Sequence, residues 1–123
     1  IAPAKASEKT LEAVAAHSRG YIYAISRDGV TGADKEATVE GLREVVDNVQ
    51  KFGGAPVLLG FGISKPEHVR DAIAAGAAGA ITGSAITNII DKYIDGNRVT
   101  DMDALKTELT EYVAAMKGAT IAS

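Results

Sequence analysis

The sequence predicts an α/β fold built from parallel βα units. Residues 21–26 and 57–61 are short apolar runs without polar alternation, which is typical of strands covered on both faces. Each run is followed by a segment with apolar residues at three- and four-residue steps, the pattern of an amphipathic helix. Strands that alternate with helices of this length imply right-handed crossovers and therefore a parallel sheet.

The first predicted unit pairs a capped helix with the strand 21–26. Ser7 can cap the helix, whose apolar stripe is Leu11, Val14 and Ala15. The polar loop 27–34 after the strand is too long for a hairpin turn. The next helix has one apolar face, made of Val39, Leu42, Val45, Val46, Val49 and Phe52.

The same arrangement then repeats. After the strand 57–61, Ser64 and Glu67 fit a capping box, with Pro66 in the first turn, where its missing N–H costs little. Gly76 ends that helix, and residues 80–82 form a third, short strand.

Two more helices complete the chain. One begins at Ser84, and a turn at 95–97 leads to the last, which is capped near Thr100. The predicted apolar faces are Ile86, Ile89, Ile90, Tyr93 and Ile94 on the first, and Leu105, Leu109, Val113 and Met116 on the second.

Composition sets limits on partners and location. The 123 residues suit one small domain with a real core, being 46% hydrophobic and 24% charged with a formal net charge of −3. There is no basic stripe to bind nucleic acid and no cysteine for disulfides or thiolate metal sites. We find no apolar run near the roughly 20 residues of a membrane span and no signal segment, so we expect a cytoplasmic protein.

Glycine and serine follow two neighbouring predicted strands. In parallel sheets, ligand sites form beyond the carboxyl ends of the strands. Backbone N–H groups of Gly62, Gly83 and Ser84, with the Ser84 hydroxyl, could therefore hold a phosphate monoester. Alternatively, Gly83 only makes the turn and Ser84 only caps the helix. Two such turns followed by a short extra helix are the phosphate-binding arrangement of (β/α)₈ barrels, which favours the phosphate.

Three stretches carry a family resemblance: Y-I-Y-A-I-S-R-D-G-V-T-G, G-F-G-I-S and G-A-A-G-A-I-T-G-S-A-I. In this order and spacing they resemble the C-terminal part of the tryptophan synthase alpha chain family, and the opening I-A-P is similar to the end of its fifth barrel strand. The resemblance implies that residues 1–123 are a single domain forming the C-terminal part of a (β/α)₈ TIM barrel, from about the end of strand 5 through the last helix.

The resemblance also implies an activity for the full-length chain. Members of this family are lyases of tryptophan biosynthesis that cleave indole-3-glycerol phosphate into indole and glyceraldehyde 3-phosphate. Indole then passes to a beta chain, which would be the partner and would hold pyridoxal phosphate, so no cofactor is expected in this chain. The loop matching 27–33 is a mobile lid, and Thr31 matches a threonine that helps to position a catalytic aspartate. The positions around the substrate phosphate match Gly32, Gly62, Gly83 and Ser84, and those beside the indole ring match Tyr23 and Phe61.

Simpler interpretations of individual residues stay open. Tyr23 and Phe61 belong to apolar strands and could be core residues, and Thr31 could be an ordinary turn residue. His17 and His68 have no metal-ligand spacing, and we expect both to be solvated.

The resemblance leaves the acid/base pair outside this sequence. In the family these groups are a glutamate on an early strand and an aspartate in a stretch resembling P-F-S-D-P, which this sequence does not contain. A barrel also needs all eight strands to close. We therefore expect a portion of a longer alpha subunit, inactive on its own.

Two rival functions also fit the sequence. One is a fragment of another phosphate-binding barrel, an isomerase or epimerase, against which the G-V-T-G loop after a Y-x-Y strand argues. The other is a non-catalytic half-barrel that binds a phosphate compound or assembles with copies of itself to cover its edges.

Overall fold

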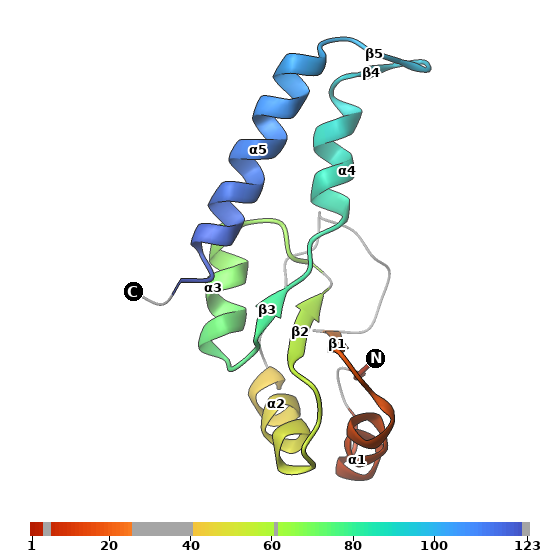
Figure 1. Ribbon diagram of the computed structural model, residues 1–123, viewed down its shortest axis with the longest axis vertical. Helices are drawn as coiled ribbons and strands as arrows, with labels where there is room; N and C mark the ends of the chain where they lie inside the picture. The colour runs from red at the N-terminus through yellow and green to blue at the C-terminus, as the bar shows by residue number, and fades with distance from the viewer. Residues whose placement is uncertain (4–5, 26–40, 61, 122–123) are drawn as a thin grey trace.

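A computed structural model describes residues 1–3, 6–25, 41–60 and 62–121, in which helices and strands alternate as the sequence predicts (Figure 1). The first six elements are α1 (Glu8–His17), β1 (Ile22–Ile25), α2 (Leu42–Lys51), β2 (Val57–Gly60), α3 (Pro66–Ala74) and β3 (Gly79–Ala80). They are followed by α4 (Ser84–Asp91), a hairpin of β4 (Ile94–Asp95) and β5 (Arg98–Val99), and α5 (Met102–Gly118).

The main sheet is parallel, which confirms the predicted fold class. Its strands lie in the order β1-β2-β3, with Ile22 opposite Val57 and Leu59 opposite Ala80. Ala2 adds a parallel bridge to β1 at its outer edge. The order of the strands in space is therefore the order of the strands along the chain.

The two faces of this sheet are buried to different extents. Ile22 and Leu59 point to one face and are 1% and 0% exposed. Tyr23, Ile25 and Leu58 alternate with the buried positions along the strands and are only half-buried. Helix residues complete the core on the first face, among them Leu11, Val45, Val46, Val49, Val69, Ala72, Met116 and Ala119.

Local signals place the first helices. The hydroxyl of Ser7 accepts a hydrogen bond from the backbone N–H of Thr10 at 3.2 Å, so the predicted cap of α1 is confirmed. Leu11 and Ala15 of the predicted stripe are buried. Helix α2 buries four residues of its predicted face, while Val39 lies outside the described residues.

The cap of the last helix lies near Thr100 as predicted, one residue after it. The N-cap of α5 is Asp101, whose carboxylate accepts from the N–H of Ala104 at 3.0 Å. The hydroxyl of Thr100 instead donates to the carbonyl oxygen of Tyr93 at 3.2 Å. Thr100 therefore closes the hairpin, and the charged side chain of Asp101 beside it caps the helix.

Two residues predicted on apolar helix faces are exposed. Ile94 lies in β4 of the hairpin and is 39% exposed, because the chain leaves α4 before the apolar spacing ends. Val113 of α5 is 52% exposed and lines a hollow of about 580 Å³ beside the edge strand β3. Its neighbours Leu105 and Met116 are buried as predicted.

Within the described ranges, no helix combines the length and the apolar character that a bilayer crossing requires.

Candidate functional site

The turns after β2 and β3 are joined by a hydrogen bond. These strands are parallel neighbours, so their carboxyl ends lie at the same edge of the sheet. The hydroxyl of Thr82 donates to the carbonyl oxygen of Ile63 at 2.8 Å. Thr82 precedes Gly83 and Ile63 follows Gly62, so the two predicted glycines lie on adjacent, connected turns.

The two glycines differ in backbone conformation and exposure. Gly62 adopts a left-handed φ of 79° and is buried, whereas Gly83 is exposed. Gly83 is the N-cap residue of α4, and no side chain caps the helix there. Its carbonyl oxygen accepts from the N–H groups of Ile86 and Thr87 at 2.9 and 3.2 Å.

Ser84 is therefore the first residue of α4, as predicted, and its hydroxyl does not act as the helix cap. The N–H groups of a helix's first turn have no intrahelical partner and carry partial positive charge. A side chain at Gly83 would meet no atom within 4 Å, so this helix start borders open space. The arrangement can receive an anion.

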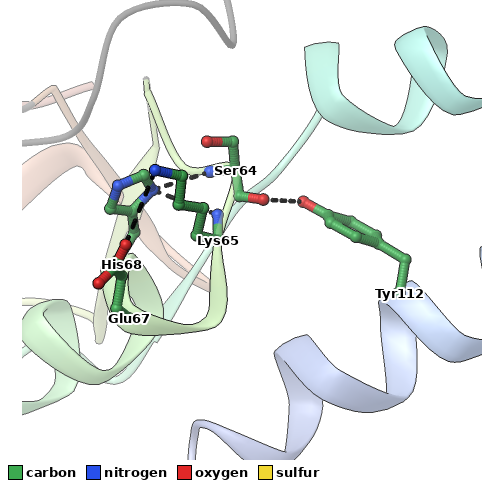
Figure 2. A network of polar contacts seen from close by, with 5 residues as sticks. All are labelled: Ser64, Lys65, Glu67, His68 and Tyr112. Atoms are coloured by element: carbon green, nitrogen blue, oxygen red, sulfur yellow. Dashed lines mark hydrogen bonds and ion pairs between the residues drawn. The ribbon is translucent and has the colours of Figure 1, made fainter.

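His68 closes the first turn of α3, contrary to two expectations. It is 5% exposed rather than solvated. Its Nδ1 accepts from the backbone N–H groups of Ser64 and Lys65, at 3.1 and 3.2 Å (Figure 2). The N-cap residue is Lys65, so the predicted capping box of Ser64 and Glu67 is wrong; Glu67 lies 3.8 Å from the Lys65 ammonium.

His68 determines which backbone donors remain in this turn. Its Nδ1 accepts hydrogen bonds from two backbone N–H groups. The N–H groups of Ser64 and Lys65 are thereby occupied. In this turn, an anion would have to be bound by backbone nearer to Gly62.

Tyr112 of α5 contacts both turns, and sequence reasoning did not identify it. Its hydroxyl donates to the carbonyl oxygen of Ser64 at 3.0 Å and lies 3.1 Å from the hydroxyl of Thr82. Nothing in the chain marks this tyrosine, because the residue is 48 positions from Ser64 and lies in an ordinary amphipathic helix. The ring also borders a cavity of about 530 Å³ between α4 and α5.

Tyr23, predicted beside the substrate ring, lies on the half-buried face of β1. Its ring covers Gly60, where an added Cβ would collide with the ring carbons and hydroxyl. The neighbouring Phe61, together with Thr31 and Gly32, lies outside the described residues. The structure thus brings Gly62, Gly83 and Ser84 to one edge, with Tyr23 on the same sheet.

Charged groups near these turns form surface pairs. Lys92, the C-cap residue of α4, lies 3.1 Å from the carboxylate of Glu108 on α5. Within the described part of the chain, no cluster of three or more histidine, aspartate or glutamate side chains could hold a metal ion.

The family profile and the similar proteins that match this chain all belong to the same family. A family profile described as tryptophan synthase alpha chain matches residues 1–119. The tryptophan synthase alpha chain of Corynebacterium glutamicum is 65% identical over 125 residues, covering 98% of this chain and 45% of its own length. That of Histophilus somni is 45% identical, covering 98% of this chain and 43% of its own. The chain therefore spans less than half the length of these relatives.

Solved structures agree in fold. A chain of the tryptophan synthase α2β2 complex from Pyrococcus furiosus superposes with a TM-score of 0.69 at 26% identity, covering 95% of this chain and 44% of that one. An Aquifex aeolicus structure superposes with a TM-score of 0.68 at 21% identity, over 96% of this chain and 38% of that one.

Proposed function

The chain belongs to the tryptophan synthase alpha chain family, and from this premise we propose that it is part of a lyase acting on indole-3-glycerol phosphate. The full-length enzyme releases indole and glyceraldehyde 3-phosphate. In this proposal residues 1–123 form the C-terminal portion of the TIM barrel, from the end of the fifth strand through the last helix.

Within that enzyme, we assign the phosphate end of the substrate to the turns after β2 and β3. The observation that supports this assignment most directly is the hydrogen bond from Thr82 to Ile63, which connects the turns of Gly62 and Gly83. The uncapped start of α4 at Ser84 adds N–H donors and the positive end of a helix dipole. Positioned donors of this kind bind a phosphate dianion without arginine or lysine.

The remaining assignments rest on the family resemblance. Gly32 joins the phosphate turns, Thr31 supports a catalytic aspartate from the 27–33 loop acting as a lid, and Tyr23 and Phe61 contact the indole ring. The general acid and base are a glutamate and an aspartate of earlier barrel strands and loops. Residues 1–123 alone would therefore bind phosphate weakly and release no indole.

A beta chain is the proposed partner. The Pyrococcus furiosus relative is described in an α2β2 complex. By extension, the full-length alpha chain delivers indole to a beta subunit that holds pyridoxal phosphate, and the alpha chain itself needs no cofactor.

The function is tested with the full-length chain that contains these residues. Purified protein should release indole from indole-3-glycerol phosphate, and Ser84→Asp should raise KM at least about tenfold, because the carboxylate repels the bound phosphate at close range. Asn88→Asp is the matched control, since Asn88 is an exposed residue one turn later on the same helix. The carboxylate at position 84 lies at the positive end of the helix and that at position 88 is exposed to solvent, so neither should unfold the helix.

The outcomes separate the candidates. Phosphate binding without indole release would favour a non-catalytic phosphate-binding module, and isomerisation or epimerisation of a sugar phosphate would favour the rival enzyme class. Indole release by residues 1–123 alone would contradict the assignment of the acid/base pair to the rest of the barrel.

A further inference from the structure

We propose that Tyr112 and Thr82 are positioning residues of the phosphate site. Their hydroxyls hold the turns of Gly62 and Gly83 in the relative placement that lets both bind one phosphate. This inference rests on the proposed function and adds to it a contribution from the last helix, α5.

Three contacts join three segments at one point. Thr82, just before α4, lies 2.8 Å from the Ile63 carbonyl oxygen and 3.1 Å from the Tyr112 hydroxyl. Tyr112, in turn, lies 3.0 Å from the carbonyl oxygen of Ser64. Two hydroxyls supply two protons for these three contacts, so two of them are hydrogen bonds at any moment. The protons can redistribute while both turns stay connected to α5.

The peptide group between Ser64 and Lys65 is held from both sides, as Figure 2 shows. Its N–H, which belongs to Lys65, donates to Nδ1 of His68, and its carbonyl oxygen, which belongs to Ser64, accepts from Tyr112. His68 belongs to α3 and Tyr112 to α5, so two different helices fix this turn. A rotation of the peptide would break both hydrogen bonds at once.

Helix α5 is itself anchored beside the site. Leu105 and Met116 are buried on either side of Tyr112 along the helix. The ion pair between Lys92 and Glu108 joins α5 to the C-cap of α4, the helix whose opposite end would receive the phosphate. Because α5 is fixed by this packing, the Tyr112 hydroxyl restrains both turns relative to the helix.

The affinity for a dianion that is bound by two turns depends on the distance between those turns. If the spacing is free to vary, binding must order it first, and the affinity falls. A hydrogen bond of ordinary strength corresponds to about a three- to tenfold change in affinity. We expect losses of that size when either hydroxyl is removed.

The test uses the full-length alpha chain with Tyr112→Phe, Thr82→Val and the double variant. Each substitution keeps the shape of the side chain and removes its hydroxyl. Dissociation constants for inorganic phosphate should rise about three- to tenfold in each single variant. KM for indole-3-glycerol phosphate should rise in parallel while kcat stays within about twofold, because binding rather than the chemical step is affected. The double variant should lose less than the product of the single effects.

Tyr93→Phe is the matched control. Its hydroxyl lies 3.5 Å from Glu108, between the same two helices but away from the turns. This variant should keep wild-type phosphate affinity and KM.

Two results would overturn the inference. One is unchanged phosphate affinity in Tyr112→Phe and Thr82→Val despite lowered melting temperatures, which would make the hydroxyls purely structural. The other is a fall in kcat at constant KM. Both are distinct from failure of the proposed function, in which the wild-type chain itself would neither bind phosphate nor release indole.

Discussion

The ring of Tyr23 lies close to the backbone of β2 at Gly60, where there is no side chain. An alanine there would place its Cβ on the ring. Because the ring would have to move, we expect Gly60→Ala to lower the free energy of unfolding by about 1–3 kcal/mol. Denaturant titration of the full-length chain measures this loss, and KM for indole-3-glycerol phosphate should rise if Tyr23 contacts the indole.

Gly118→Ala is the matched control for that substitution. Gly118 ends α5, and an added Cβ there meets no atom within 4 Å. Alanine should therefore be neutral or stabilise the protein by up to about 1 kcal/mol, because it restricts the unfolded chain. Equal destabilisation by both substitutions would contradict the role given to the Tyr23 ring.

His68 supplies the second prediction at this scale. His68→Ala removes the acceptor for two backbone N–H groups at the start of α3 and should cost about 1–3 kcal/mol in the free energy of unfolding. His17→Ala, at an exposed position, should change it by no more than about 0.5 kcal/mol. Thermal or urea unfolding compares the two.

Residue roles were the least predictable part of the molecule. Sequence spacing correctly placed Gly62 and Gly83 after neighbouring strands, because parallel strands end at one edge. It did not predict that His68 turns back onto the turn before α3, or that Tyr112 reaches Ser64 from another helix. Those contacts depend on how helices pack, which residue spacing along one helix does not specify.

At the scale of single elements, substitutions at Asp101 test whether its carboxylate caps and stabilises α5. Asp101→Ala removes the hydrogen bond to Ala104 and should destabilise the chain by about 1 kcal/mol. Asp101→Asn should retain most of the stability, since asparagine caps helices equally well. If alanine and asparagine behaved alike in urea unfolding, the capping role would be wrong.

Elements themselves were well predicted. Apolar runs gave β1 and β2, and three- and four-residue spacing gave α1, α2 and α5. The boundary after α4 was missed because Ile94 continues the helical spacing into a hairpin, where Gly96 turns with a φ of 63°. Periodicity alone does not mark where a helix stops.

At the scale of the whole molecule, Val113 is an apolar side chain that the described residues leave exposed. It faces a hollow of about 580 Å³ beside β3, and a complete barrel would place further structure there. In Val113→Cys, thiol labelling should therefore be at least about tenfold slower in the full-length chain than in residues 1–123 alone. Peptide mass spectrometry can follow this site, because residues 1–123 contain no native cysteine.

Val99→Cys controls for this comparison. Val99 is exposed in the β4–β5 hairpin, away from the sheet (Figure 1), and should label quickly in both proteins. Equal labelling of Val113→Cys in the two proteins would show that the hollow stays open in the longer chain.

The agreement between strand order in the sheet and strand order along the chain bears on assembly during synthesis. Within the described residues each strand pairs with the one that precedes it along the chain, and Ala2 pairs with β1. Each step therefore closes a single crossover connection between neighbouring strands. Amide protection during refolding should consequently spread from β1 and β2 toward β3, in the same direction in which the polypeptide is made.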